Sequence, residues 1–427
     1  MYLNSKSYEK KYRKYKKKYK ILKSNIGGAK GTLRGGDCSP LPNPEEEDLA
    51  TTHNLLDLCP EERITIQNKC YEVRGLYTWI IKGNHIKLPS TQTDITTEDK
   101  LRLIEAYEEL PKVFVPNILT RDKLIEIYSN LQQETHINLS SKGYADIALD
   151  TFNNLSYLQN LYLDNNQIKN LQSNTFNNLP ELRYLSLNNN QIRELSSGIF
   201  DNLPKLQFLF LENNQIRELQ PDIFDNLPNL YNLNLYNNQI IELQPGIFNN
   251  LPKLNFLFLE NNQIRGLQSG IFNNLPILKE LRLSNNRIQE LQSNTFNNLL
   301  NLTILKLDHN QIRELQPGIF NNLSILEFLY LNNNQISILQ SGAFNNLSRL
   351  VYIKLNNNRI QELQLGTFNN LSSLKYLHLN DNQIRELPPG IFDNLQNLFT
   401  LYFNHNQIGD LQPNSYYGLS TNTQIRI

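Results

Sequence analysis

Residues 158–181 read LQNLYLDNNQIKNLQSNTFNNLPE, and the pattern in this stretch decides the fold because it returns every 24 residues without an insertion. The shared frame is L-x-x-L-x-L-x-x-N-x-I-x-x-L-x-x-x-x-F-x-x-L-x-x. One unit cannot bury its apolar residues alone, whereas a stack of units can, so the pattern predicts a solenoid. The frame starts at Leu158, Leu182, Leu206, Leu230, Leu254, Leu278, Leu302, Leu326, Leu350, Leu374 and Leu398.

Each unit is expected to contain one short strand at its Leu-x-Leu step. Alternate residues of a strand point to the same side, so Leu161 and Leu163 are predicted to face the core and Tyr162 to face away from it. The asparagine at position nine follows the strand, where a buried amide can bond to the backbone of neighbouring turns and form a ladder. The phenylalanine at position nineteen is predicted to form a spine on the convex side.

This frame resembles that of the leucine-rich repeat family in its 24-residue form, over about residues 134–427. The resemblance implies an α/β-type solenoid, which is a curved horseshoe with a parallel sheet on its concave face. Full repeats are expected over 158–427, and Ile425 and Ile427 fall at the strand positions of a terminal half-repeat. Residues 111–157 fit the frame only in part and are predicted to form degenerate repeats or an N-terminal cap.

Composition divides the chain further. Asparagine favours neither helices nor strands, so 64 asparagines beside 74 leucines in 427 residues indicate fixed positions in a repeat. The net charge of zero is an average, because residues 1–36 carry 12 basic residues and one acidic residue, residues 37–150 carry 11 and 20, and residues 151–427 carry 18 and 20. The sequence therefore predicts a basic tail with a linker (1–36) and a small acidic domain of helical or α+β type (37–110) before the solenoid.

The cellular location is predicted from what the sequence lacks. No stretch approaches the about 18 apolar residues of a membrane span, and no apolar segment like that of a secretory signal follows the basic N-terminus. The cysteines, Cys38, Cys59 and Cys70, all precede the repeats, which argues against a disulfide scaffold. We therefore expect an intracellular protein that is not secreted, located in the cytoplasm, which for a viral protein would be that of the host.

The variable strand positions are expected to lie exposed on the concave face, and many of them are aromatic. Contiguous exposed apolar surface usually marks a binding site, and aromatic residues are favoured interface anchors. Thirteen strands at about 4.8 Å would give a face on the order of 60 Å long, which suits a protein or peptide ligand. The candidate partner-binding residues are Tyr162, Tyr184, Phe208, Phe210, Tyr236, Phe256, Phe258, Arg282, Lys306, Phe328, Tyr330, Tyr352, Lys354, Tyr376 and Tyr402.

The same face bears on two other roles. The aromatic rows could instead stabilise the sheet by cross-strand contacts. Charges of both signs, with Asp164 and Glu212 on the same face as a basic island of Arg282, Lys306 and Lys354, argue against a specific nucleic-acid ligand, because a phosphate backbone selects one sign.

A second resemblance lies before the repeats. Tyr71-Glu72 is followed by a predicted helix with Trp79 and then by the loop Pro89-Ser90-Thr91-Gln92. This order resembles the U-box, the metal-free relative of the RING domain, over about residues 55–110. In that family the helix and the proline loop dock a ubiquitin-conjugating enzyme, so the resemblance implies that Trp79 and Pro89 would contact it. The alternative is a small helical cap that shields the first repeat.

The basic tail carries its own pattern. Tyr8, Tyr12, Tyr15 and Tyr19 recur at spacings of four and three, which predicts one face of a helix. GGAKGTLRGG at 27–36 is typical of a flexible linker. The tail resembles a leader found on proteins of giant viruses of amoebae. A short coiled coil, a basic helix on an anionic surface and a solubilising tail remain open interpretations.

The repeats contain no recognisable catalytic motif. No Gly-rich phosphate loop or nucleophile triad can be assembled, and the cysteines and histidines lack the spacing of a zinc site, so no metal or cofactor is predicted. The first hypothesis is a non-enzymatic scaffold that binds a protein or peptide on the concave face. The alternative is a ubiquitin-ligase substrate receptor, in which the repeats select targets and residues 55–110 recruit the conjugating enzyme.

Overall fold

The structure is a computed structural model of the 427-residue chain, and it describes residues 117–409 and 419–426 together with the backbone of four short strands before them. Two compact units, Met1–Val115 and Pro116–Ile427, make up the chain and are treated separately. Among the described residues, no helix is both long and apolar enough to cross a membrane.

In the first unit, the described strands form two antiparallel pairs. Strand β1 (Glu47–Asp48) pairs with β2 (His53–Asn54), and β3 (Arg63–Ile66) pairs with β4 (Lys69–Glu72). Strand β4 ends with the tyrosine and glutamate that open the U-box-like pattern. Trp79, Pro89 and the basic tail lie outside the described residues, so their proposed roles stay predictions.

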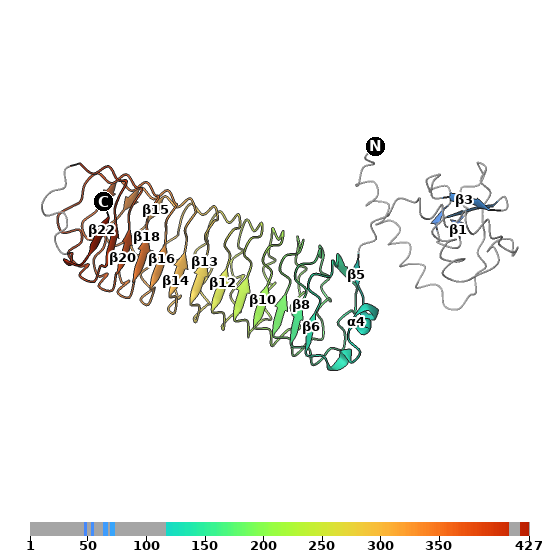
Figure 1. Ribbon diagram of the computed structural model, residues 1–427. Coiled ribbons are helices and arrows are strands. Elements are labelled where there is room, and N and C mark those ends of the chain that lie inside the picture. The colour runs from blue at the N-terminus through green and yellow to red at the C-terminus, as the bar shows by residue number, and fades with distance from the viewer. Residues whose placement is uncertain are drawn as a thin grey trace. The chain divides into compact units, whose positions relative to one another are not determined.

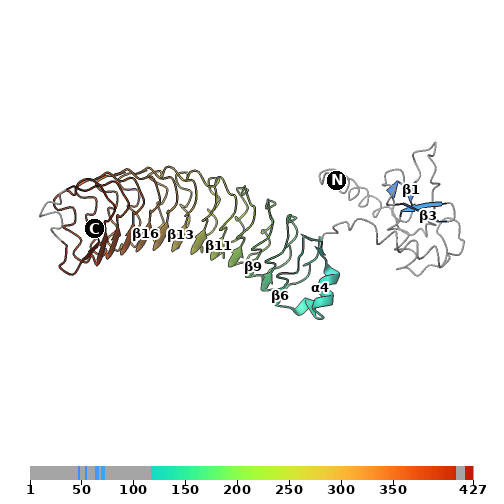
Figure 2. The same cartoon turned by 45° about the horizontal axis from the view of Figure 1, so that its top comes forward.

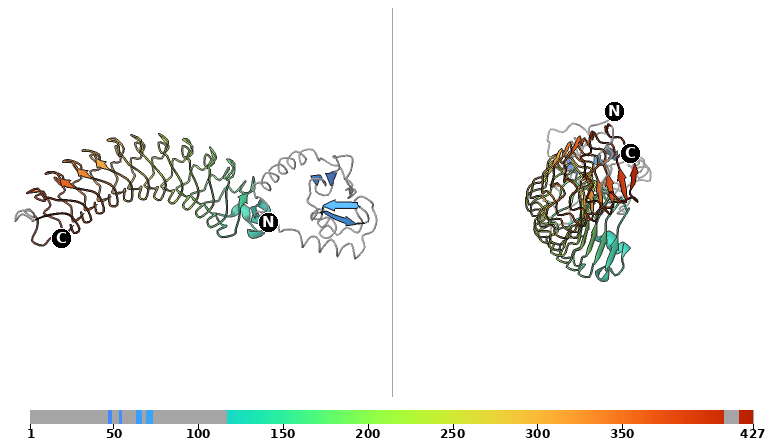
Figure 3. Two further views of the ribbon diagram at one scale, coloured as in Figure 1. Left: turned by 90° about the horizontal axis from the view of Figure 1, so that it is seen from above. Right: turned by 90° about the vertical axis from the view of Figure 1, so that its left-hand side faces the viewer.

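The second unit is a solenoid with a continuous parallel sheet of thirteen strands along its concave side (Figure 1, Figure 3). Each turn adds one strand of three residues, as the Leu-x-Leu step predicts. Figure 2 shows the turns stacked with little helix between them. The strands are β6 (His136–Asn138), β8 (Asn160–Tyr162), β9 (Tyr184–Ser186), β10 (Phe208–Phe210), β11 (Asn232–Asn234), β12 (Phe256–Phe258), β13 (Glu280–Arg282), β14 (Ile304–Lys306), β16 (Phe328–Tyr330), β18 (Tyr352–Lys354), β20 (Tyr376–His378), β21 (Thr400–Tyr402) and β22 (Gln424–Arg426).

Shorter elements complete the described part of the solenoid. A second parallel sheet contains β15 (Glu314–Leu315), β17 (Ile338–Leu339) and β19 (Glu362–Leu363). At the N-terminal end, β5 (Ile118–Leu119) pairs with β7 (Asp146–Ile147), and helix α4 (Arg121–Ile127) and the 3-10 helix η4 (Leu131–Gln133) lie between them in sequence.

The N-terminal helix closes the apolar core at this end. Thr120 precedes helix α4 and its side chain accepts a hydrogen bond from the Lys123 amide, which is the usual way to begin a helix. Leu124 and Leu131 are buried in the same core as the repeat leucines. A terminal repeat would otherwise expose its apolar side, so these residues act as its cover.

The predicted phenylalanine spine is confirmed. Consecutive rings stack along the solenoid with centroids 6.0–6.5 Å apart and ring planes within 21° of parallel. Each ring is less than 2% exposed, so the spine fills the space that the leucines leave. Its members are Phe152, Phe176, Phe200, Phe224, Phe248, Phe272, Phe296, Phe320, Phe344, Phe368 and Phe392.

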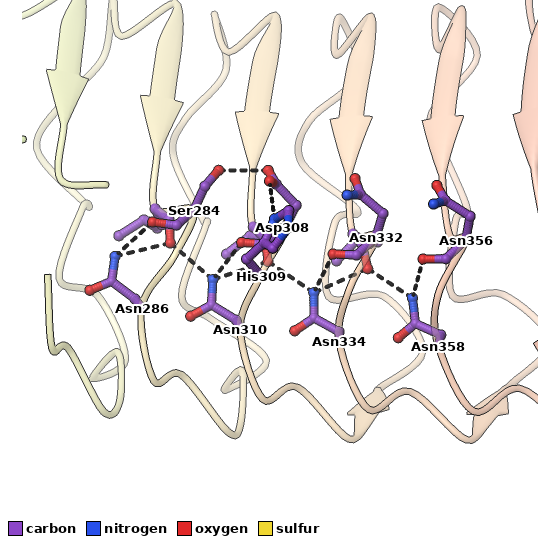
Figure 4. A network of polar contacts seen from close by, with 12 residues as sticks. Ser284, Asn286, Asp308, His309, Asn310, Asn332, Asn334, Asn356 and Asn358 are labelled. Carbon is purple, nitrogen blue, oxygen red and sulfur yellow. Dashed lines mark hydrogen bonds and ion pairs between the residues drawn. The ribbon is translucent and has the colours of Figure 1, made fainter. Parts of the chain in front are cut away.

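The asparagine ladder at position nine is also confirmed, and Figure 4 shows four of its members. The Asn310 Nδ2 donates to the carbonyl of Leu307 at 3.1 Å and to that of Leu283, one turn earlier, at 2.9 Å. Its Oδ1 accepts from the Ile288 amide at 3.0 Å. Each such side chain therefore satisfies three buried backbone groups and joins two turns.

The backbone conformation explains why asparagine also recurs at position eight, which the sequence did not reveal. In all eleven repeats this residue has φ between 53° and 59°, a left-handed conformation that asparagine, aspartate and histidine tolerate better than most residues. The repeats without asparagine at this position have His309, Asp381 or His405, which belong to the same tolerant group.

On the convex side, exposed asparagines bond between turns, as in the 3.1 Å bond from Asn202 Nδ2 to Asn177 Oδ1.

Replacement of one ladder residue tests this account. The Asn286→Ala substitution removes the acceptor of the buried Ile264 amide and one of the two asparagine donors to each of the Leu259 and Leu283 carbonyls, which keep Asn262 and Asn310. We expect the free energy of unfolding to fall by about 1–3 kcal/mol, measured by urea denaturation, because a buried unpaired amide is costly. The matched control is Asn274→Ala at an exposed convex position, which should change stability by less than about 0.5 kcal/mol. Equal effects of the two substitutions would contradict the ladder's role.

Candidate functional site: the concave aromatic face

The concave face is organised in rows because the strands pair without a register shift. On neighbouring strands, Tyr184 lies beside Phe208, Phe208 beside Asn232 and Asn232 beside Phe256. The fifth positions form a second row in the same way, and both rows point away from the buried leucines. Side chains 24 residues apart in sequence therefore become neighbours on the face.

Aromatic rings form one cluster toward the N-terminal end. Tyr184 touches Tyr162, Phe208 and Phe210 with ring centroids 4.9, 6.0 and 5.2 Å apart. Tyr231 then links two strands, with centroids 5.8 Å from Phe208 and 5.4 Å from Phe256. We name this the N-terminal aromatic cluster, with members Tyr162, Tyr184, Phe208, Phe210, Tyr231, Phe256 and Phe258.

A second cluster lies toward the C-terminal end. Tyr352 is its centre, with ring centroids 5.6 Å from Tyr330, 5.7 Å from Tyr376 and 5.2 Å from His378. His378 is also 4.4 Å from Tyr402. We name this the C-terminal aromatic cluster, with members Phe328, Tyr330, Tyr352, Tyr376, His378, Phe399 and Tyr402.

The structure thus brings most of the predicted aromatic residues together and adds three. The candidates did not include Tyr231, Phe399 and His378. Tyr231 and Phe399 occupy position two of their repeats, outside the alternating strand positions. His378 occupies a strand position but is not a hydrophobic aromatic residue. Tyr236 contacts no other aromatic ring among the described residues and is 36% exposed.

The strand residues were expected to be exposed, and the structure shows their aromatic rings only partly exposed. The aromatic rings at positions three and five are half-buried, because neighbouring rings cover part of each other's surface. Cross-strand contacts are therefore present, as the alternative interpretation of the aromatic rows requires. Each such ring pair is worth about 0.5–1.5 kcal/mol, and the uncovered part of each ring remains accessible to a partner.

Charged residues lie between the two clusters. Arg282 packs over the Phe258 ring at 4.2 Å, and its Nε lies 2.6 Å from Glu280 Oε1 and its Nη1 3.5 Å from Glu260 Oε1. Glu260 is only 8% exposed, and this burial raises the pKa of its carboxyl although Arg282 opposes the shift. Its Oε2 is buried without a hydrogen-bond partner.

The predicted basic island is smaller than expected. Two glutamates engage Arg282, so it does not act as a free cation beside the lysines. Lys306 and Lys354 flank Tyr330 on the two adjacent strands, with their Nζ atoms 5.4 and 5.7 Å from its ring centroid. Within residues 117–409 and 419–426, no carboxylate lies within 4 Å of either ammonium group.

The family model described as "Leucine rich repeat" matches seven overlapping segments that together cover residues 135–421. The chain belongs to the leucine-rich repeat family. No curated protein matches its sequence.

Solved leucine-rich repeat structures share the fold. An internalin (InlF) from Listeria monocytogenes is 24% identical with a TM-score of 0.53, and the match covers 72% of this chain and 88% of that one. A leucine-rich repeat protein from Leptospira interrogans is 26% identical with a TM-score of 0.54, covering 66% and 78%. The LRIM1/APL1C complex gives 26% identity and a TM-score of 0.58, covering 72% of this chain and 53% of that one.

One titratable residue of this leucine-rich repeat face has a strongly shifted pKa. Burial among the rings and, to a lesser extent, the nearby Lys354 ammonium together lower the pKa of His378 to about 4. At neutral pH the imidazole is therefore uncharged and behaves as one more ring of the C-terminal aromatic cluster.

This shift predicts a pH dependence with a definite sign. The unfolded chain binds a proton at His378 near pH 6.5 and the folded chain only near pH 4, so this residue's contribution to stability is present above pH 6.5 and is lost as the pH falls toward 4. We expect an NMR titration of the His378 ring protons to show a midpoint near 4, and Lys354→Met to raise that midpoint. In His378→Gln, the melting temperature should fall less between pH 6.5 and 4. A wild-type midpoint near 6.5 would contradict the burial.

Proposed function

We propose that this leucine-rich repeat protein is a non-enzymatic scaffold that binds a protein or peptide segment along its concave face. The observation that carries the proposal is the pair of half-exposed aromatic clusters aligned on one sheet. Aromatic rings with accessible edges are typical anchors of protein interfaces, because they supply large contact area with few rotatable bonds.

The dimensions of the face favour a macromolecular ligand. Thirteen strands span on the order of 60 Å, and the two clusters lie on opposite sides of the charged residues on β13 and β14. A small molecule would fill only one cluster, whereas an extended or folded protein segment could contact both. Among the related structures, LRIM1/APL1C is itself a complex of two proteins, which supports a protein as the class of ligand.

The charged groups of the face are engaged in ways that suit binding rather than chemistry. Arg282 is held by two glutamates and a ring, and the two lysines pack on Tyr330. In the part of the chain that the structure describes, no three His, Cys, Asp or Glu side chains gather as a metal site would require.

The ubiquitin-ligase alternative stays a prediction from sequence. Within 55–110, the structure describes only the backbone of β3 and β4. The residues that would contact a conjugating enzyme, Trp79 and Pro89, lie outside the described part of the chain.

Substitution of three rings tests the proposed binding face. In the triple variant Phe208→Ser, Phe256→Ser and Phe328→Ser, affinity capture with the full chain, read by mass spectrometry, should lose the proteins that the wild type retains. The melting temperature should also fall, because these half-buried rings lose contacts with neighbouring rings, but the buried core is unchanged and the variant should still unfold in one cooperative transition well above the temperature of the capture.

The matched control replaces three apolar residues that are exposed away from the concave rows, in the variant Tyr157→Ser, Leu300→Ser and Leu365→Ser. It should capture the same proteins as the wild type. Retention by the ring variant, or equal loss by the control, would contradict the proposal.

A further inference from the structure

Strand β11 interrupts the N-terminal aromatic cluster with two short polar side chains. Asn232 and Asn234 lie in register between Phe208 and Phe210 on β10 and between Phe256 and Phe258 on β12. Since neighbouring strands are about 4.8 Å apart, Phe210 and Phe258 stand about 9.6 Å apart across Asn234. Tyr231 bridges the rings of Phe208 and Phe256, but no ring of the described residues bridges Phe210 and Phe258.

Carboxylates border this position. Glu212 and Glu260 follow β10 and β12 two residues beyond Phe210 and Phe258, so one acid lies beyond each of the two rings. Glu212 is half-buried and has no ion-pair partner among the described residues, although its carboxylate accepts a hydrogen bond from Asn234 Nδ2. Glu260 adds a second carboxylate in a less solvated place, and one of its oxygens lies 3.5 Å from Arg282 Nη1. We name Phe210, Asn234, Phe258, Glu212 and Glu260 the β11 frame.

The polar atoms without partners here are all acceptors. Asn232 Oδ1 and Glu260 Oε2 are buried and receive no hydrogen bond. Asn234 has already used both sides of its amide, because Nδ2 donates to Glu212 and Oδ1 accepts from the Tyr236 amide at 3.0 Å. A face with surplus acceptors and negative charge is complementary to a cationic donor. A hydrogen bond to a buried unpaired acceptor also contributes more to the binding free energy than a bond to a solvated one.

Aromatic rings on both sides decide which cation fits. A planar guanidinium offers five donors and stacks on rings, whereas an ammonium is a compact, strongly hydrated point charge. Flat contacts at about 3.5–4 Å on each side of a guanidinium plane add up to about 7–8 Å, so a guanidinium has room between rings on strands about 9.6 Å apart and each ring must lean toward it by about 1 Å. The chain already shows this pairing, because the Arg282 guanidinium lies 4.2 Å from the centroid of Phe258.

We infer that the β11 frame binds an arginine side chain of the partner protein, with the guanidinium between Phe210 and Phe258 and paired with Glu212. This inference rests on the proposed function, since it names the chemistry by which one part of the concave face recognises its partner. The unpaired Oε2 of Glu260 offers a further acceptor beyond Phe258, and Asn234 holds the Glu212 carboxylate in place.

The test uses peptides selected from a random library on the full chain. Each selected peptide is synthesised with its arginines intact and with citrulline, a neutral isostere, in their place. For the wild type, citrulline should weaken binding about tenfold at one arginine, the loss expected for a charge-assisted hydrogen bond with ring stacking. Selected peptides that bind equally well with citrulline would overturn the inference.

Variants locate the arginine. Glu212→Gln removes the charge and keeps the acceptor, and Phe210→Leu keeps the apolar bulk and removes the ring. Each should weaken the arginine peptide about tenfold and leave the citrulline peptide unchanged. The control Glu218→Gln makes the same charge change in the same repeat at an exposed position off the concave rows, and should bind like the wild type. Equal behaviour of the Gln variants at 212 and 218 would also overturn the inference.

The outcomes separate this inference from the proposed function. Some peptides could lose binding in the triple serine variant yet bind equally well with citrulline. That result would support the concave face as the binding site and would refute only the arginine site. A library that yields no peptide, or only peptides that bind the triple serine variant as well as the wild type, would refute both.

Discussion

The hydrogen bonds of the asparagine at position nine are the constraint on which the rest of this structure depends. Each side chain satisfies two carbonyls and one amide, and two of these three bonds reach the preceding turn. Because successive ladder asparagines are always 24 positions apart, the turns stack without slippage. The in-register strands, the phenylalanine spine and the rows on the concave face all follow from that fixed register.

Much of the fold could be predicted from the sequence because each prediction depended on spacing alone. The strand at the Leu-x-Leu step, the ladder, the spine and the final half-strand β22 need only the period and the alternation of side chains. The left-handed residue at position eight could not be foreseen, because φ is a property of the folded backbone and its asparagine looks the same in sequence as that of the ladder. The structure therefore explains eight more of the 64 asparagines.

The binding face was predicted less completely, for reasons of geometry. Tyr231 and Phe399 lie outside the alternating strand positions, so only side-chain direction places them in the clusters. Arg282 was expected beside the lysines, but its length lets it reach glutamates on its own strand and just beyond the preceding one. Burial of the rings likewise depends on contacts between strands that a one-dimensional pattern does not contain.

The two ends of the face differ in charge as well as in sequence. The N-terminal aromatic cluster is bordered by Glu212 and Glu260, and the C-terminal one contains rings flanked by Lys306 and Lys354. A partner of the proposed kind would meet rings at both ends but opposite charges, and charge complementarity of this sort sets orientation more than affinity. The ring contacts that stabilise the sheet and the ring edges that a partner would use belong to the same residues, so binding and stability are linked on this surface.

Amide hydrogen exchange of the full chain tests the ladder most directly. The amides of Ile216, Ile264 and Ile312 donate to the side-chain oxygens of Asn238, Asn286 and Asn334 of the following turn, and they lie outside the concave strands. If these bonds hold the turns in register, the three amides should exchange as slowly as the amides of the concave sheet, because they open only when the stack itself opens. Exchange as rapid as that of the exposed convex turns would contradict the account.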